Sequence, residues 1–291
     1  MNILSFGEII WDVYPEAATL GGAPLNFAAH AALQGANATL LSCVGKDPLG
    51  QRALEEIRAL GLDTAGIGLS DKAPTGQCTV TLNSDGIPSY RIAEISAYDH
   101  ISLPAKSVEK YHALAFGTLA LRGTHNRAVL EKLMAETPFE EIFTDLNIRP
   151  PFFSRESVEF CLIHATILKV SDEELPTVTH LLFSAEWKDA EAAAELSARY
   201  PNLELILITK GEKGALCYDC KEKRFYSCPA APTTVISTVG AGDSFGAAFL
   251  THYHRTQDIP AALHRAAQVS AFVVSRKEAI PTDVPMFETP L

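Results

Sequence analysis

The sequence predicts an α/β fold built on a doubly wound, mainly parallel sheet that carries a small antiparallel β unit. Short apolar runs rich in Ile, Leu and Val recur along the chain between turn residues, as in parallel strands buried on both faces. Segments with a helical period lie between these runs, so strands and helices alternate. The stretch 75–95 breaks the alternation, because two β-prone pieces flank an Asp-Gly turn at 83–86.

The predicted elements follow one another from the first residues onward. Strands are predicted at 3–6, 38–44, 113–116, 142–144, 166–170 and 203–209. Helices are predicted at 25–34, 50–60, 127–136, 155–162 and 189–199. Gly61 follows the second helix, where a glycine commonly ends a helix. A second hairpin is predicted over 214–227 with its turn near 219–223, and the proline-containing tail after Ala279 is predicted to be irregular.

Composition and charge narrow the classes of function. The 291 residues include 24 Lys and Arg against 35 Asp and Glu, which gives a formal net charge of −11. A hydrophobic fraction of 47% with 20% charged residues is typical of a soluble globular protein. The acidic balance argues against a nucleic-acid partner, which needs clustered Lys and Arg. No apolar run approaches the ~20 residues of a spanning helix, and the N-terminus lacks a basic signal region. We therefore expect a cytoplasmic protein with no membrane partner.

The cysteines offer one candidate site. Cys217 and Cys220 have the C-x-x-C spacing, and Cys228 follows eight residues later. A structural zinc site commonly needs two such pairs, and no second pair or nearby His exists. The favoured interpretation places these cysteines on a strand, its turn and the return strand, while a metal or redox role stays open.

The clearest local signal for chemistry is the glycine-rich segment 238–249, which predicts a loop that opens a helix. Gly240, Ala241 and Gly242 allow backbone N–H groups to approach a ligand, and a helix N-terminus favours an anion. Asp243 falls in the first helical turn, where its carboxylate either caps the helix or acts as a base beside the anion.

A second signal lies near the N-terminus. Gly21 and Gly22 follow Asp12 closely and permit a backbone approach that side chains would block. Asn26 offers both a donor and an acceptor, which suits a polyhydroxylated ligand. The alternative is that the glycines only form a turn and that Asn26 is a solvated helix residue.

Further polar residues and glycines lie at or just after the ends of predicted strands, and the carboxyl ends of parallel strands line the ligand crevice in open α/β sheets. These residues are Asn147 and Arg149 in one loop, Lys169, Ser171 and Glu174 in the next, and Thr209, Gly211 and Gly214 in a third. Ser171 with Glu174 three residues on is also typical of a helix capping box. No P-loop and no G-x-G-x-x-G after the first strand is present.

Taken together, the motifs resemble the ribokinase (PfkB) family of ATP-dependent sugar kinases over nearly the whole chain. In order they are Asp12, Gly-Gly-x-x-x-Asn at 21–26, Val-Gly-x-Asp-x-x-Gly at 44–50, Thr-x-Gly-x-x-Gly at 209–214 and Gly-Ala-Gly-Asp at 240–243. The resemblance implies a ribokinase-like fold with one kinase domain over 1–291. It also implies a small β lid contributed by about 12–20 and 75–100, through which two copies pair as a homodimer.

The resemblance also implies roles for individual residues. Asp243 matches the catalytic base, and Gly240, Ala241 and Gly242 match the backbone anion hole. The sugar-binding positions are Asp12, Gly22, Asn26, Arg91, Asn147 and Arg149. The nucleotide-binding positions are Lys169, Ser171, Thr209, Gly211 and Gly214. Glu174 matches a glutamate that holds Mg²⁺ through water. The family commonly has Asp where this chain has Ser237, so K⁺ stays an open cofactor beside ATP and Mg²⁺.

Within the family, the segments 7–12, 22–26, 97–101, 145–149 and 169–174 resemble bacterial fructokinases, although Tyr98 stands where those relatives have Trp. This implies transfer of the γ-phosphate of ATP to the primary hydroxyl of a ketohexose, D-fructose, to give fructose 6-phosphate. A 2-keto-3-deoxygluconate kinase is the alternative, with Arg91 or Arg149 binding the substrate carboxylate. A nucleoside kinase and a non-catalytic sugar sensor also stay open, and the intact 240–243 motif argues against the sensor.

Overall fold

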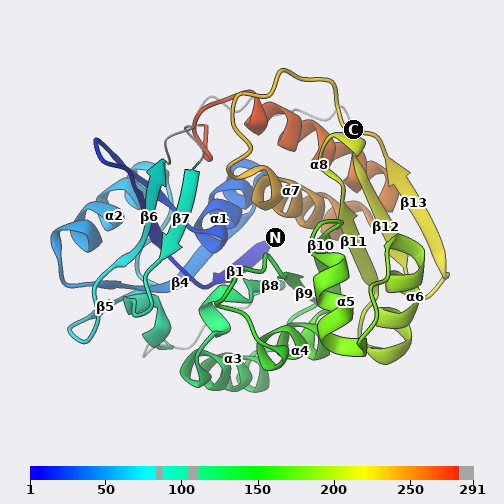
Figure 1. The fold of residues 1–291 in the computed structure, drawn as a ribbon, viewed down its shortest axis with the longest axis horizontal. Coiled ribbons are helices and arrows are strands. Elements are labelled where there is room, and N and C mark those ends of the chain that lie inside the picture. Colours follow the sequence, from blue (N-terminus) through cyan, green and yellow to red (C-terminus); the bar gives the residue numbers. More distant parts are fainter. Residues whose placement is uncertain (83–87, 104–110, 282–291) are drawn as a thin grey trace.

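The computed structural model describes residues 1–82, 88–103 and 111–281, and Figure 1 shows its elements. Within these residues the largest unit is a nine-stranded sheet with the order β13-β12-β11-β10-β9-β8-β1-β4-β5. Its strands are β1 (Asn2–Phe6), β4 (Asn37–Gly45), β5 (Ile67–Ser70), β8 (Ala113–Gly117), β9 (Glu141–Asp145), β10 (Ile167–Ser171), β11 (Leu205–Thr209), β12 (Ala215–Asp219) and β13 (Arg224–Cys228). All neighbours from β5 to β11 pair in parallel, so their carboxyl ends meet at one edge of the sheet.

Helices cover both faces of this sheet, which confirms the predicted doubly wound α/β fold. The helices are α1 (Ala23–Leu33), α2 (Pro48–Ala59), α3 (Thr124–Glu136), α4 (Arg155–His164), α5 (Leu175–Phe183), α6 (Asp189–Arg199), α7 (Ala241–Thr256) and α8 (Ile259–Val274), with 3-10 turns at Ala97–His100, Leu119–Leu121 and Gly211–Lys213. One hydrophobic core lies between the sheet and α3 to α6, and a second lies between the sheet and α1, α2, α7 and α8. In β11, Leu207 enters the second core and Ile208 the first, as the two-residue period of a strand requires.

Two helices have no range predicted from the sequence, although the capping-box interpretation of Ser171 and Glu174 indicated a helix start near α5. Helix α5 is short, and its apolar positions follow the strand β10 after a single turn. Helix α8 nevertheless carries a start signal: Asp258 accepts a hydrogen bond from the N–H of Ala261 at 2.9 Å, and a proline occupies the first turn. The prediction failed there because α8 is apolar over much of its surface and follows α7 after only two residues, Gln257 in the αL conformation and the N-cap Asp258.

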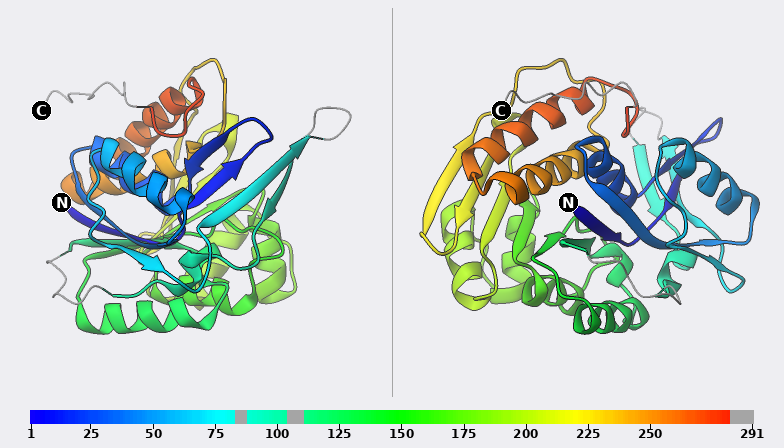
Figure 2. Two further views of the ribbon diagram at one scale, coloured as in Figure 1. Left: turned by 90° about the vertical axis from the view of Figure 1, so that its left-hand side faces the viewer. Right: turned by 180° about the vertical axis from the view of Figure 1, so that it is seen from behind.

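A second sheet lies beside the first, with the order β3-β2-β6-β7. Its strands are β2 (Ile10–Val13), β3 (Ala18–Gly21), β6 (Gly76–Leu82) and β7 (Pro88–Ile92). The predicted hairpin over 75–95 is confirmed as the antiparallel pair β6–β7, while its turn at 83–86 lies outside the described residues. Figure 2 shows this pair extending away from the main sheet. The tail at 282–291 also lies outside the described residues.

The second predicted hairpin is confirmed as β12–β13, which adds two antiparallel strands to the edge of the main sheet. Cys217 lies on β12 and enters the core beneath α7 and α8, whereas Cys220 in the turn packs against the opposite core. Cys228 ends β13. The two thiols of the C-x-x-C pair therefore face opposite sides of the sheet, which agrees with a structural role for them.

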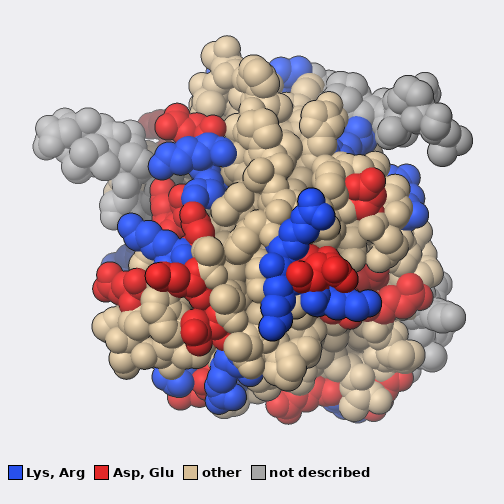
Figure 3. All heavy atoms as spheres, turned by 90° about the vertical axis from the view of Figure 1, so that its right-hand side faces the viewer, with Lys and Arg blue, Asp and Glu red and all other residues tan. Residues whose placement is uncertain are grey.

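The distribution of charged side chains and the helix lengths agree with the expectations drawn from the composition. On the face that Figure 3 shows, Lys and Arg side chains lie among Asp and Glu side chains rather than in one basic patch. Among the described residues, no helix combines the length and apolarity needed to cross a membrane.

Candidate active site

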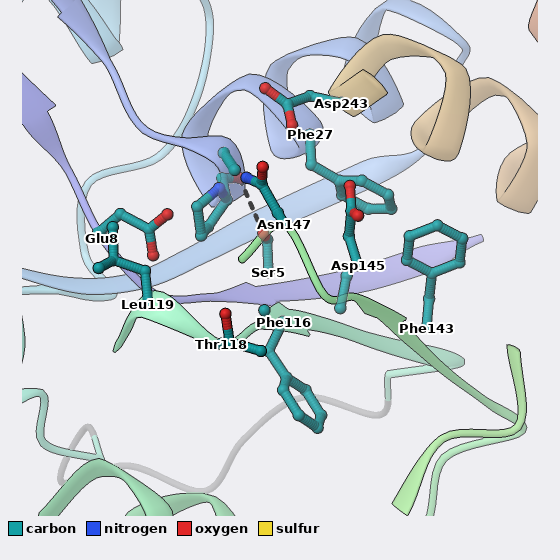
Figure 4. Close-up of a pocket in the computed structure, with 14 residues that line it drawn as sticks. Ser5, Glu8, Phe27, Phe116, Thr118, Leu119, Phe143, Asp145, Asn147 and Asp243 are labelled. Atoms are coloured by element: carbon teal, nitrogen blue, oxygen red, sulfur yellow. Dashed lines mark hydrogen bonds between the residues drawn. The ribbon is translucent and has the colours of Figure 1, made fainter. Parts of the chain in front are cut away.

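A pocket opens at the carboxyl-end edge of the main sheet, between β1, β8 and β9 on one side and the starts of α1 and α7 on the other. Its lining combines apolar residues with the polar side chains of Ser5, Glu8, Thr118, Asp145, Asn147 and Asp243. Figure 4 shows these side chains projecting from the strand ends and from α7 into a common space. Ser5 ties β1 to the start of α1, because its hydroxyl donates to the carbonyl oxygen of Pro24 at 2.8 Å.

Asp243, which lines this pocket, meets Asn26 of α1 although 217 residues separate them along the chain. Nδ2 of Asn26 donates to Oδ2 of Asp243 at 2.8 Å. The N-cap of α7 is Gly240 with no side-chain cap bond, so Asp243 does not serve as the cap that the sequence left open. Asn26 is only 4% exposed, so it is not the solvated helix residue of the alternative interpretation. The Asp243 carboxylate is thus oriented by the buried Asn26 amide, and it does not cap its own helix.

The protonation of Asp243 reflects this environment. Its pKa is raised to about 6, first by burial and second by the negative charge of Asp145. The hydrogen bond from Asn26 and the positive charges of Lys169 and Arg149 act in the opposite direction. A carboxylate with a pKa near 6 is ionised at neutral pH and has a high proton affinity for an Asp, which suits a general base.

Glu8 is a second carboxyl group in the pocket that sequence reasoning missed. It lies two residues after the end of β1 and is 4% exposed. Its pKa is raised to about 7, chiefly by burial, and the charge of Asp243 contributes to the rise. Backbone hydrogen bonds lower it. Its position after a parallel strand, the rule applied to other loops, would have identified it.

Lys169 and Asp145 form a buried ion pair beneath α7. They are direct partners in the register of β10 and β9, and Nζ of Lys169 lies 2.6 Å from Oδ2 of Asp145. Burial alone would lower the pKa of Lys169, but the charge of Asp145 and its hydrogen bond outweigh that effect and raise the pKa. The lysine therefore remains an ammonium. Asp145 opens the segment 145–149 that was singled out from the sequence, but only Asn147 and Arg149 were given a predicted role there.

The glycines of the 240–242 loop hold the start of α7 in place. Gly240 has a φ of 78°, and a Cβ built on it would lie 2.7 Å from the carbonyl oxygen of Ala279. The N–H of Ala241 donates to Thr238, so helix geometry leaves Gly242 and Asp243 to present their N–H groups at the helix end. A Cβ on Gly242 would lie 3.1 Å from Nζ of Lys169, which places the ammonium directly against this first turn.

The residues predicted to bind sugar lie toward the second sheet. Gly22 has a φ of 117°, and a Cβ there would lie 2.4 Å from the carbonyl oxygen of Glu8, so the close approach requires glycine. Asp12 lies on β2, and its pKa is raised by burial, whereas Cys78 and Arg149 lower it. Arg149 thus acts electrostatically on both Asp12 and Asp243. Arg91 is exposed on β7.

The residues predicted to bind nucleotide lie at the ends of β10 and β11. Ser171 and Thr209 are register partners, and the turn after Thr209 closes with a bond from the N–H of Lys210 to Gly214 at 2.8 Å. Gly214 has a φ of 91°, and a Cβ there would lie 2.1 Å from the carbonyl oxygen of Cys228. Gly211 also has positive φ, at 54°.

The capping-box interpretation of Ser171 and Glu174 needs a correction. Their reciprocal hydrogen bonds exist, at 2.9 Å and 3.2 Å, but Ser171 ends β10 and Glu174 itself is the N-cap of α5. The other carboxylate oxygen of Glu174 accepts from the N–H of Ile148 at 2.6 Å. Glu174 therefore connects the loops after β9 and β10, which fixes the orientation of its carboxylate.

Comparison with known proteins gives consistent matches over most of the chain. The family model described as pfkB family carbohydrate kinase matches residues 15–285. The chain is 28% identical over 313 residues to the probable fructokinase-3 of Arabidopsis thaliana, which covers 96% of this chain and 87% of that protein.

Two solved structures share the fold. One is a fructokinase with bound ATP from Xylella fastidiosa, with a TM-score of 0.82 and 23% identity over 96% of this chain and 94% of the other. The second is a fructokinase from Vibrio cholerae O395 in its fructose, ADP and calcium ion bound form, with a TM-score of 0.81 and 22% identity over 96% and 94% of the two chains.

Proposed function

The chain belongs to the pfkB family of carbohydrate kinases and is an ATP-dependent sugar kinase, and we propose that its substrate is a ketohexose, D-fructose, which it converts to fructose 6-phosphate. The observation that carries the proposal is the Asn26–Asp243 hydrogen bond in a pocket at the amino end of α7. It joins the segment predicted to bind sugar to the residue predicted to act as base. The names of the Arabidopsis relative and the two structural neighbours support fructose as the acceptor.

In the proposed reaction, Asp243 accepts the proton of the primary hydroxyl while the oxygen attacks the γ-phosphorus of ATP. Phosphoryl transfer depends mainly on alignment and charge stabilisation. The N–H groups at the start of α7, with the Lys169 ammonium against Gly242, are suited to stabilise the developing negative charge. The second sheet, as a lid, would exclude water that competes with the sugar for the phosphoryl group.

A divalent cation fits the donor chemistry of the loop after β10. Glu174 supplies hard carboxylate oxygens, and three protein donors, Ile148, Ser171 N–H and the Ser171 hydroxyl, already orient them. A contact through water suits Mg²⁺, which keeps part of its hydration shell. Bound with ATP, Mg²⁺ would neutralise phosphate charge. The nucleotide would lie toward Ser171, Thr209, Gly211 and Gly214.

Arg149 favours one alternative substrate. It is exposed, acts electrostatically on Asp12 and Asp243, and makes no ion pair with a carboxylate within the described part of the chain. A guanidinium placed in this way suits a substrate carboxylate, as in 2-keto-3-deoxygluconate.

An assay of ADP release over fructose, 2-keto-3-deoxygluconate and a nucleoside tests these assignments. We expect the highest kcat/KM with fructose and no turnover above background in the Asp243→Ala variant. Preference for the keto acid would replace fructose by the alternative substrate, and it should then be lost in Arg149→Ala. Absence of turnover with every acceptor would point to a non-catalytic sensor. Sedimentation of the purified chain tests the separate proposal that two copies pair through the second sheet.

A further inference from the structure

Asp145 is a largely buried carboxylate of the pocket, 16% exposed, for which the proposed reaction gives no role. It is the last residue of β9 and lines the pocket together with Asp243. Its Oδ2 pairs with Lys169, whereas its Oδ1 is buried and has no hydrogen-bond partner in the described part of the chain. A buried carboxylate oxygen without a donor is costly, so its presence calls for a reason beyond stability.

The partner of Asp145 lies where an anion would bind. Lys169 is 5% exposed, and its Nζ lies against Gly242 in the first turn of α7. Both the ammonium and the amino end of the helix attract negative charge. A lysine reaches such a position on a flexible four-carbon stem, so a fixed partner is needed to hold its charge in one place.

We infer that Asp145 is a positioning residue for phosphoryl transfer, which holds the Lys169 ammonium against the first turn of α7 beside Asp243. The inference rests on the proposed kinase reaction. In that reaction the sugar oxygen forms a bond to the γ-phosphorus, and the bond from phosphorus to the ADP oxygen breaks with its electron pair on ADP. The hydroxyl proton goes to Asp243. Asp145 neither takes this proton nor forms a bond to phosphorus, and it acts through Lys169.

The same carboxylate also acts on Asp243 through its charge. The groups that face Asp243 are the amide of Asn26 from α1, Glu8 after β1, Asp145 on β9, Arg149 after β9 and Lys169 on β10. After burial, Asp145 has the largest effect on the pKa of Asp243, which it raises, while Lys169 lowers it. Removing either partner should therefore move the titration of Asp243, and in opposite directions.

The test follows the Asp243 carboxyl by carbon-13 NMR across pH in the protein without substrates, and measures kcat and KM with the preferred sugar. In Asp145→Asn the pKa of Asp243 should fall by about 1 unit, the size that a neighbouring charge produces. The kcat should fall about 10- to 100-fold, as expected for misplaced charge, with KM changing much less. In Lys169→Gln the pKa of Asp243 should rise and kcat should also fall.

The double variant Asp145→Asn with Lys169→Gln separates an effect on catalysis from a loss of folding. It removes both charges of the pair, so no unpaired buried charge destabilises the protein. We expect its Asp243 pKa to lie near that of the wild type and its kcat to stay low. The matched control is Glu141→Gln at the other end of β9, a buried carboxylate with a paired base, which should leave both the titration and kcat in place.

An unmoved Asp243 titration in Asp145→Asn, or a loss confined to KM, would overturn the positioning role while wild-type turnover remained. A wild type that phosphorylates no sugar would instead overturn the proposed function. The two failures are distinguishable, because the NMR titration needs no substrate.

Discussion

Strand β9 turns one face toward helix α7, and the two ends of that contact differ in how their polar groups are paired. Alternate residues of β9 meet successive parts of α7: Asp145 acts on Asp243, Phe143 packs on Gly246, and Glu141 contacts His254. At the Glu141 end, Nδ1 of His254 lies 2.9 Å from Oε1 of Glu141. The centre is apolar, since a Cβ on Gly246 would lie 2.8 Å from the Phe143 ring.

The Asp145 end is the one where pairing is incomplete. Oδ1 of Asp145 and Oδ1 of Asn26 are buried without a hydrogen-bond partner in the described residues, and the pKa of Asp243 is raised to about 6. At the opposite end, the side chains partner each other and the backbone: His112 accepts from the N–H of Asn2 at 2.9 Å, and its ring meets the His254 ring edge-on. Nδ1 of His252, near the far end of α7, is also buried without a partner in the described residues, but only at the Asp145 end do such atoms lie beside a pocket, which indicates where a ligand belongs.

The largest expected effect comes from removing the base. Asp243→Asn keeps the size of the side chain and its place beside Asn26 but cannot accept the proton, so kcat should fall by about 10² to 10⁴. The melting temperature at neutral pH should rise rather than fall, because an ionised carboxyl group whose folded pKa is raised destabilises the fold and the amide removes that charge. Steady-state kinetics and a melting curve on the same preparation check both statements.

The pH dependence of the wild type provides the control for that variant. Asp243 works as a base only when ionised, so kcat/KM should rise with pH through about 6, the pKa of its carboxyl group in the free protein. Residual activity in Asp243→Asn should lack this limb. A variant with near-normal kcat, or with the same limb, would show that another group takes the proton.

The third prediction concerns Glu8, whose buried carboxylate should destabilise the fold when it is ionised. The pKa of Glu8 is about 7 in the folded protein against an ordinary 4.5, so between these values the folded state holds a proton that the unfolded state has lost. Stability therefore falls as pH rises from 4.5 through 7. Glu8→Gln removes this loss and should raise the free energy of unfolding at pH 8 by about 3 kcal/mol.

Urea unfolding of Glu8→Gln and wild type at pH 5 and pH 8 measures that gain. At pH 5 the folded wild type carries a neutral Glu8, so the two proteins should differ by less than about 1 kcal/mol. An equal difference at both pH values would mean that packing, rather than charge, distinguishes the two proteins.

The contrast also explains how much the sequence could predict. The apolar run at 142–144 predicts the centre of β9, because the hydrophobic pattern detects only buried apolar residues. The strand extends one residue further at each end, to Glu141 and Asp145, and these polar ends are the residues that distinguish the two regions. The pattern cannot assign them, since their roles depend on α7, which lies about a hundred residues later in the chain.

The candidate site was predictable where a glycine in the sequence marks a special backbone conformation. The glycines at 240–242 indicate a close approach at a helix start whatever their partners, and the structure has that geometry. For Glu8 and Asp145, no neighbouring residue in the sequence indicates a special role. A carboxylate after a strand is ordinary until burial and neighbouring charges act on it, and both depend on contacts between distant segments.

Removing the Glu141 carboxylate tests whether the paired end of the β9–α7 contact serves stability rather than catalysis. Glu141→Gln removes a charge from a buried carboxylate that contacts His254, and the free energy of unfolding should fall by about 1 to 3 kcal/mol. The kcat should stay unchanged, because this end lies at the opposite edge of the sheet from Asp243. Urea unfolding and steady-state kinetics provide the two readouts, and a large loss of kcat in a folded variant would contradict the division of roles.

The smallest effect is expected from an exposed ion pair at the carboxyl-end edge. Nζ of Lys46, which follows β4, lies 2.5 Å from Oδ2 of Asp71, but the two side chains are 52% and 72% exposed. Water and salt screen such a pair, so Asp71→Asn should change the free energy of unfolding by less than about 1 kcal/mol. Urea unfolding at low and high salt measures this. A loss as large as that in Glu141→Gln would mean that position at this edge, rather than burial, determines what a charge contributes.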